Sequence, residues 1–416
     1  MPDSYPQRPH SPSGQTDAAT LLLCGARLAD GRTVDVRLGG GRIEAVGTAG
    51  SLAAGTSRAL AAKVDLNGYL LLPAPAEPHA HSDTALTADD AGPLAYDAQE
   101  VQRRATEAAL LQLGHGATAL RSHVRVGDVQ GLDALAAVLQ ARRSLRGLVD
   151  LTAVAMPRVL TGVAGADGLA MLRDAVKMGA SVVGGCPDAD PDPTGYVEAI
   201  LELASEHGCP IDLHTDGADP ARLARLAAVA GGLRHGVTLG PCGGLSRLPA
   251  ETASRAADQL AAAGVTVVCL PQGGCGAVER HGTAPVRLLR AAGVTVAAGS
   301  GALRDVSNPV GRGDPLEAAY LLASRYGLRP EDAYGAVSCA ARAALGLPEV
   351  RLEAGFPAEL LAVRGDRLAG ALSLAYSRLV VHRGCVVART SAVREYCNSA
   401  AAAELDLPRQ GRGEPS

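Results

Sequence analysis

Short apolar runs alternate with longer amphipathic segments through the middle of the chain. The runs have the length and composition of buried strands, and the segments repeat their apolar positions with the period of a helix. The predicted strands cover 69–72, 117–124, 148–156, 181–186, 210–215, 237–240, 265–270 and 294–299. The predicted helices include 135–143, 168–178, 196–207, 221–230, 253–263, 284–292, 315–325 and 330–345. This alternation favours an α/β fold, with a parallel sheet closed into a (β/α)8 TIM-like barrel over residues 72–345.

The two ends of the chain have a different pattern. Short strand-like runs separated by Gly and Asp turn residues fill 20–65, and similar runs recur at 359–364 and 377–387. Such runs are typical of a small all-β unit. We therefore expect one β-sandwich domain made from residues 20–71 and 346–390. The polar and Pro-rich residues 1–19 are expected to be a disordered tail, and 391–416 a C-terminal tail.

Composition narrows the classes of function. Hydrophobic residues make up 47% of the chain and aromatic residues 2%, so a large core must consist mainly of Leu, Val and Ala. The net charge of −4, without a long basic run, argues against a nucleic-acid partner. The nine cysteines show no paired spacing, and no apolar run resembles a signal peptide or a membrane span. We expect a cytoplasmic protein that acts on a small molecule, and a homo-oligomer remains open.

The candidate chemistry begins at His79 and His81, which follow the apolar run at 69–72. In an extended segment, side chains two residues apart point to the same side, so both imidazoles can converge on a metal ion. His214 ends the fifth predicted strand, and the carboxyl ends of barrel strands meet at one face. These three histidines are the predicted ligands of one divalent metal ion. The alternative is a set of unrelated loop and core histidines.

Other polar residues lie at strand ends or in the loops that follow them. Arg121 and His123 are two residues apart on the second strand, so both can face inward, and His123 is a candidate substrate contact or simply a buried histidine. Arg158 ends the third strand and is a candidate for binding an anionic substrate, unless it is a surface residue. Cys242 and Cys275 lie in glycine-rich loops, where no neighbouring base supports a cysteine nucleophile.

The stretches PHAHSDTALT, LRSHVRVGD, SVVGGCP and IDLHTD, with the closing helices before GFPAELLAV, resemble the cytosine deaminase branch of the amidohydrolase superfamily. The resemblance extends from about residue 64 to residue 387. It implies a distorted barrel flanked by a β-sandwich from both termini. It also implies one Zn or Fe ion, which activates water against a C–N bond of a small nitrogen heterocycle. The carboxylated lysine of two-metal members has no counterpart on the fourth strand.

Several catalytic positions depart from the family pattern. The family's proton-carrying glutamate, substrate-polarising histidine, metal-binding aspartate and substrate-reading glutamine fall, in this order, at Gly217, Pro241, Gly301 and Arg158. Glycine and proline side chains can neither bind a metal nor transfer a proton, and one positioned acid or base typically contributes about 10²–10⁴-fold in rate. Asp216 is the predicted catalytic replacement because it faces the side of an ideal strand that His214 faces. The alternative is that Asp216 caps the next helix.

Two functions remain open on the sequence alone. The resemblance favours metal-dependent hydrolysis or deamination of a C–N bond in a small cyclic substrate, by an incomplete site. The lost acid and base groups favour a non-catalytic barrel, a pseudoenzyme, that binds a small molecule or a partner. Metal in the purified protein, lost when His79 is replaced by alanine, would support the enzyme.

Overall fold

The structure, a computed structural model, describes residues 20–52, 61–90, 94, 96–127, 131–232, 236–275, 282–374 and 377–392. The expected N-terminal tail and almost all of the expected C-terminal tail lie outside these residues. The division into a barrel and an end domain remains a prediction as far as its boundaries are concerned, but the strands fall into two separate sheets.

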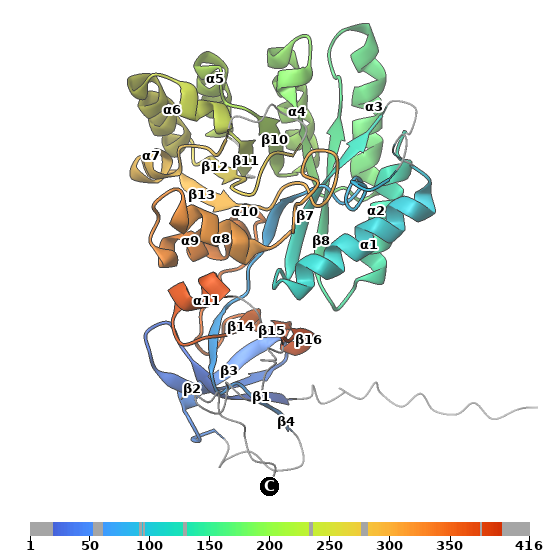
Figure 1. The fold of residues 1–416 in the computed structure, drawn as a ribbon. Coiled ribbons are helices and arrows are strands. Elements are labelled where there is room, and N and C mark those ends of the chain that lie inside the picture. Colours follow the sequence, from blue (N-terminus) through green and yellow to red (C-terminus); the bar gives the residue numbers. More distant parts are fainter. Residues whose placement is uncertain are drawn as a thin grey trace, which may run out of the picture.

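Eight parallel strands form the barrel, as the alternating pattern predicted (Figure 1). They follow one another around the sheet in chain order, and every neighbouring pair is parallel. An isolated parallel bridge between Ala80 and Gly301 joins the last strand to the first. The strands are β6 (Glu77–Ala80), β7 (Ala119–Val126), β8 (Asp150–Pro157), β9 (Val182–Gly185), β10 (Ile211–Thr215), β11 (Val237–Pro241), β12 (Thr266–Cys269) and β13 (Thr295–Ala298).

Helices surround these strands on the outside of the barrel. They are α1 (Ala98–Gly114), α2 (Asp133–Ser144), α3 (Gly162–Met178), α4 (Pro193–His207), α5 (Pro220–Ala230), α6 (Ala250–Ala262), α7 (Val286–Ala291), α8 (Pro315–Ser324), α9 (Pro330–Val337) and α10 (Cys339–Ala344), with 3-10 turns η2 (Pro187–Ala189) and η3 (Gly243–Arg247). Aspartates fix where several of them begin. The side chains of Asp97, Asp192, Asp219 and Asp314 accept hydrogen bonds from first-turn amides, which satisfies donors that a helix cannot pair internally.

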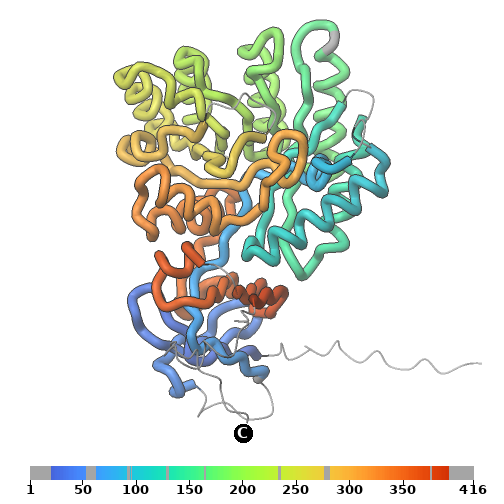
Figure 2. The backbone as a smooth tube through the Cα atoms, in the orientation of Figure 1, coloured from blue at the N-terminus to red at the C-terminus, as the bar shows by residue number. Residues whose placement is uncertain are grey.

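Both chain ends contribute to a second, eight-stranded sheet with its own core. Figure 2 shows the blue N-terminal and red C-terminal segments lying together on one side of the barrel. The strands run in the order β16-β15-β14-β5-β1-β2-β3, and β4 pairs with β1. They are β1 (Thr20–Arg27), β2 (Thr33–Gly39), β3 (Arg42–Thr48), β4 (Ala61–Asp65), β5 (Tyr69–Pro73), β14 (Leu360–Arg364), β15 (Arg378–His382) and β16 (Cys385–Thr390), and a short helix, α11 (Leu368–Leu374), lies between β14 and β15.

The apolar run at 69–72 was wrongly predicted to be the first barrel strand. It forms β5, which pairs with β14 and β1 in the end sheet, and the first barrel strand is β6. Leu71 packs in the core of the end sheet, whereas Leu70 and Leu72 pack against the barrel helices. Because both faces of β5 are buried, its sequence is as apolar as that of a barrel strand, and periodicity cannot distinguish the two.

Within the described part of the chain, no helix is both long and apolar enough to cross a membrane.

Candidate metal centre

The first barrel strand holds His79 by its backbone and presents it inward. The four residues of β6 are buried, and Glu77 accepts a hydrogen bond from the backbone N–H of His79 at 2.9 Å. The Glu77 carboxylate also accepts hydrogen bonds from the hydroxyl of Ser300 at 2.5 Å and from its backbone N–H. Burial raises the pKa of Glu77 to about 7, against the effect of these hydrogen bonds. Glu77 therefore ties the end of β13 to the strand that carries the first histidines.

Four imidazole rings meet inside the barrel. His79 follows Glu77 on β6, His81 comes just after that strand, and His123 and His214 come from β7 and β10. The ring centroid of His79 lies 4.4 Å from those of both His123 and His214. The Nε2 atoms of His81 and His214 are 3.2 Å apart. The structure thus brings together the three predicted metal ligands and the predicted substrate contact His123.

The environment keeps three of these rings neutral. Burial lowers the pKa of His79, His81 and His214 well below the usual range, and the neighbouring histidines lower it further. Both ring nitrogens of His79 and the Nδ1 of His214 are buried without a hydrogen-bond partner. A neutral imidazole nitrogen is the form that binds a metal, so the cluster has the protonation state that a metal site needs.

The cluster fits a metal ion in its donor atoms as well. Unpartnered buried nitrogens cost free energy unless a ligand satisfies them. Two zinc–nitrogen bonds of about 2.0–2.1 Å in a tetrahedron place the two nitrogens about 3.3–3.4 Å apart, close to the 3.2 Å between His81 and His214. The cluster is therefore a histidine-rich candidate metal site. The assignment of individual ligands stays a prediction.

A buried ion pair orients His123. Arg121 donates to the Asp212 carboxylate at 2.8 Å, and the Nε2 of His123 lies 3.2 Å from the other oxygen of that carboxylate. The Nδ1 of His123 lies 3.3 Å from the backbone oxygen of Ala80, which can only accept a hydrogen bond. Burial opposes ionisation of Asp212, but His123 and Arg121 together hold the pKa of its carboxyl group below the usual range. Arg121 and His123 both point inward, as their spacing predicted.

Asp212 and Glu77 were not among the predicted site residues. Each lies two positions before a predicted histidine ligand on the same strand, and side chains at that spacing share one face. The two-residue spacing that paired His79 with His81 also relates each carboxylate to its histidine. Extending this spacing toward the start of each strand would have identified both carboxylates.

Cys275 is a further residue that sequence reasoning did not connect to the histidines. It lies six residues after β12 and is 3% exposed. The candidate ligand atoms of His79, His81, His214 and Cys275 all lie within 4.8 Å of one another. The interpretation that no base lies near this thiol holds only along the sequence, because the fold places three imidazoles beside it.

Asp216 follows β10 and is 9% exposed. Its carboxylate accepts a hydrogen bond at 2.8 Å from the backbone N–H of Gly244, in the turn after β11. Helix α5 is capped by Asp219 and not by Asp216. Asp216 belongs to neither group of candidate metal ligands found among the described residues. Its catalytic role stays a prediction.

Arg158 follows the last residue of β8 and is exposed. This position is at the carboxyl end of the barrel, where loops surround the mouth. Its role in binding an anionic substrate also stays a prediction.

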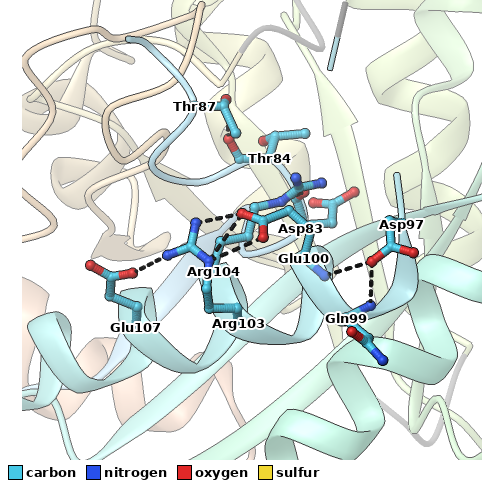
Figure 3. A network of polar contacts seen from close by, with 9 residues as sticks. All are labelled: Asp83, Thr84, Thr87, Asp97, Gln99, Glu100, Arg103, Arg104 and Glu107. Atoms are coloured by element: carbon cyan, nitrogen blue, oxygen red, sulfur yellow. Dashed lines mark hydrogen bonds and ion pairs between the residues drawn. The ribbon is translucent and has the colours of Figure 1, made fainter. Parts of the chain in front are cut away.

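A polar network fixes the segment that follows His81 (Figure 3). Arg104 on α1 donates from Nε to the backbone oxygen of Asp83 at 2.6 Å. Asp97 begins the same helix by accepting hydrogen bonds from two first-turn amides, and Arg103 bridges two glutamates on its outer face. Burial raises the pKa of Asp83, which is fully enclosed. The start of α1 thus holds the chain directly beyond the histidine pair.

Comparison with known proteins gives relatives for this arrangement. The model of the amidohydrolase family matches residues 84–388. A pterin deaminase of Rhizobium rhizogenes is 28% identical over 375 residues, which cover 82% of this chain and 85% of that protein. An N-isopropylammelide isopropyl amidohydrolase of Pseudomonas sp. is 25% identical over 296 residues, which cover 64% and 72% of the two chains.

Solved structures share the same architecture. N-isopropylammelide isopropylaminohydrolase from Burkholderia multivorans superposes with a TM-score of 0.78 at 29% identity, covering 90% of this chain and 100% of that one. A 5-methylcytosine deaminase from Klebsiella pneumoniae superposes with a TM-score of 0.77 at 23% identity, covering 91% and 100%. The second likeness concerns the fold alone.

Proposed function

The chain belongs to the amidohydrolase family, and on that premise we propose that it is a metal-dependent hydrolase that cleaves an exocyclic C–N bond of a small nitrogen heterocycle. The observation that carries the proposal is the cluster of three neutral, buried imidazoles, His79, His81 and His214, inside the barrel. His79 and His214 have ring nitrogens without a hydrogen-bond partner. Most buried polar atoms in proteins have a hydrogen-bond partner, so nitrogens left without one beside other imidazoles favour a bound ligand.

His79, His81 and His214 would hold one divalent ion, Zn or Fe. An ion held there supplies Lewis-acid activation of water for attack on carbon. Because burial keeps the three rings neutral, binding the ion does not require them to lose protons first. Glu77 fixes the backbone of His79, so the first ligand is positioned before any ion arrives.

The remaining predicted residues would act on the substrate. His123 is the proposed substrate contact, and its ring is oriented by the Ala80 carbonyl and by Asp212. Asp216 is the proposed carrier of a proton at its carboxylate, although it also accepts a hydrogen bond from Gly244. Arg158, exposed at the end of β8, would bind an anionic substituent of the substrate.

The relatives suggest the class of substrate. One acts on a pterin, and others act on N-isopropylammelide. Both substrates are nitrogen heterocycles with an amine outside the ring, so we propose the same class here. In the overall reaction the C–N bond breaks, water supplies the new C–O bond, and the amine leaves with the remaining proton.

The non-catalytic alternative is not favoured. The named relatives are enzymes, and the chain keeps the histidine cluster although it lacks the family's glutamate and aspartate.

Release of amine from a panel of pterin, N-isopropylammelide and cytosine tests the proposal. We expect ammonia from pterin or isopropylamine from N-isopropylammelide, and none from cytosine, because Arg158 and Pro241 replace the residues that read and polarise it. His214→Ala should abolish the activity, and His207→Ala, on the outer helix α4, should leave it unchanged. A folded, metal-loaded protein that releases no amine from any heterocycle of the panel would contradict the proposal.

Arg158→Ala tests substrate binding separately. We expect KM for a carboxylated heterocycle to rise about 10-fold or more, in line with the loss of a charge-assisted hydrogen bond, with kcat and stability unchanged. An unchanged KM would remove Arg158 from the binding site.

A further inference from the structure

Cys275 completes the histidine cluster in space. Its Sγ lies within 4.8 Å of the candidate ligand atoms of His79, His81 and His214, and those atoms lie within the same distance of one another. All four residues are buried, with exposed fractions between 0% and 7%. Imidazole nitrogen and thiolate sulfur are both donors that zinc binds in proteins.

The charge of the cluster points to the same residue. Three neutral imidazoles leave both positive charges of a divalent ion uncompensated in the interior of the barrel, where burying a charge is costly. Gly301 stands at the position where the resembling family has its metal-binding aspartate. A thiolate supplies one negative charge at the ion, as that aspartate would.

The loop that carries Cys275 lies in front of Gly301. A Cβ at Gly301 would meet the backbone oxygens of Gly273 and Gly274 at 3.4 Å and a methyl group of Leu270 at 3.2 Å. Gly301 also has a φ of +71°, which other residues adopt at a cost. The absence of a side chain at Gly301 therefore leaves room for the loop that carries Cys275.

Hydrogen bonds hold this loop in place. Gln272 donates from Nε2 to the backbone oxygen of Asp314 at 2.5 Å, and Asn308 donates to the backbone oxygen of Gln272 at 3.2 Å. Gly273 closes a turn by donating to the oxygen of Leu270 at 3.2 Å. Because its preceding residues are anchored, Cys275 reaches the cluster from a defined direction.

We propose that Cys275 is the anionic fourth protein ligand of the metal ion, taking the place of the family's eighth-strand aspartate. In binding, the S–H bond breaks, a bond from sulfur to the metal forms, and the proton leaves to solvent, with no change of oxidation state. The inference deepens the proposed function and rests on it, since it assumes that His79, His81 and His214 bind the ion.

Asp212 is the competing anionic ligand, because it forms a second group with His79 and His123. Its carboxylate is paired with Arg121 at 2.8 Å and lies 3.2 Å from His123. A ligand oxygen from Asp212 would have to give up part of that pairing with Arg121. The two alternatives differ in the element bound to the metal.

X-ray absorption at the zinc edge of the zinc-loaded protein distinguishes them. We expect one sulfur scatterer at about 2.3 Å together with nitrogen scatterers at about 2.0–2.1 Å. Cys275→Ala should remove the sulfur scatterer. It should also speed the loss of zinc to a chelator by about 100-fold or more, because losing even a residue that hydrogen-bonds a metal ligand typically weakens metal binding by about 10–100-fold. Cys269→Ala is the matched control, because Cys269 is equally buried at the end of β12 and lies outside both ligand groups.

Cys275→Asp should restore zinc retention, with a shell of nitrogen and oxygen only. This rescue separates a metal ligand from a residue that merely packs in the core.

Each result decides the inference. Zinc bound in the wild-type protein by nitrogen and oxygen alone overturns the role of Cys275 and leaves the proposed metal-dependent function standing. Folded wild-type protein that binds no zinc and no iron overturns both. If Cys275→Ala does not fold, the wild-type spectrum is sufficient, since it shows whether sulfur binds the metal.

Discussion

Two sides of the same barrel end differ in what their strands carry. On one side, β6, β7 and β10 carry histidine and carboxylate side chains that are buried and face one another. On the other side, β11 ends in Gly240 and Pro241, and Gly301 follows β13. A Cβ at Gly240 would lie 3.5 Å from the Nδ1 of His79, so even the glycine side borders the cluster directly.

The two sides would contribute different things to a metal site. The histidine side offers donor atoms that the fold has already positioned. The glycine side offers no donor at Gly240 or Gly301, but it lets the loop before Cys275 come close. Under the proposal that Cys275 binds the metal ion, this loop supplies the ligand that the end of β13 lacks.

Removing a ligand on the histidine side should have the largest effect. His79→Ala is expected to reduce bound metal from about one ion per chain to a trace and to abolish hydrolysis, because His79 belongs to both candidate ligand groups among the described residues. Metal analysis after gel filtration measures this. His207→Ala, at the end of α4, should keep full occupancy. Equal metal content in the two variants would show that the cluster is not the binding site.

Breaking the buried ion pair between Arg121 and Asp212 should have the second largest effect. Arg121→Met leaves the Asp212 carboxylate buried without its guanidinium, which is expected to lower the free energy of unfolding by about 3–5 kcal/mol. Urea denaturation measures this loss. Arg103→Met, which removes exposed ion pairs on α1 that solvent screens, should reduce the free energy of unfolding far less. Similar losses in both variants would mean that Arg121 and Asp212 do not form a buried pair.

Adding a side chain at Gly301 should destabilise the fold less than breaking the Arg121–Asp212 pair, and it should not improve metal binding. Gly301→Asp places a Cβ at positive φ against the loop before Cys275, so we expect a loss of about 1–3 kcal/mol in unfolding free energy. Metal retention against a chelator should not improve. Gly335→Ala, in α9 with open space around it, is the control and should not destabilise the protein. A Gly301→Asp variant that retains metal more tightly would show that this side can still accept the aspartate.

A pH-dependent effect is expected away from the barrel end, where Asp314 at the start of α8 pairs with Arg378 on β15. Burial opposes ionisation of Asp314, but the Arg378 guanidinium holds its pKa below the usual range. A carboxyl group whose pKa is lower in the folded state stabilises the fold at pH values above its unfolded-state pKa of about 3.9. This stabilisation is lost as the pH falls through the folded-state pKa. Asp314→Asn should therefore lower stability at pH 7 and weaken its decline below about pH 4, measured by thermal unfolding.

Asp174→Asn, in an exposed pair with Lys177, should leave that pH profile unchanged. An Asp314→Asn profile identical to that of the wild-type protein would mean that the pair does not carry the acid sensitivity.

Local pattern was sufficient for much of the site. The spacing of His79 and His81, and the place of His214 at a strand end, predicted that three imidazoles would meet, and they do. The same pattern could not assign β5, because a strand buried on both faces looks alike in either sheet. It also did not reveal that Asp216 would turn to Gly244, since the direction of a side chain beyond a strand end depends on the next loop.

By itself, the sequence determined the alternating strands and helices, the closed barrel, the end sheet drawn from both termini and the histidines at the strand ends. These follow from periodicity and from side chains at short spacing, which act within a few residues of one another. Only the tertiary structure decided which distant residues join them: Glu77 with Ser300, Arg121 with Asp212, and Cys275 with three histidines. Cys275 is about sixty residues or more from each of those histidines along the chain, and no local pattern encodes such an approach, because it depends on how loops pack when the barrel closes.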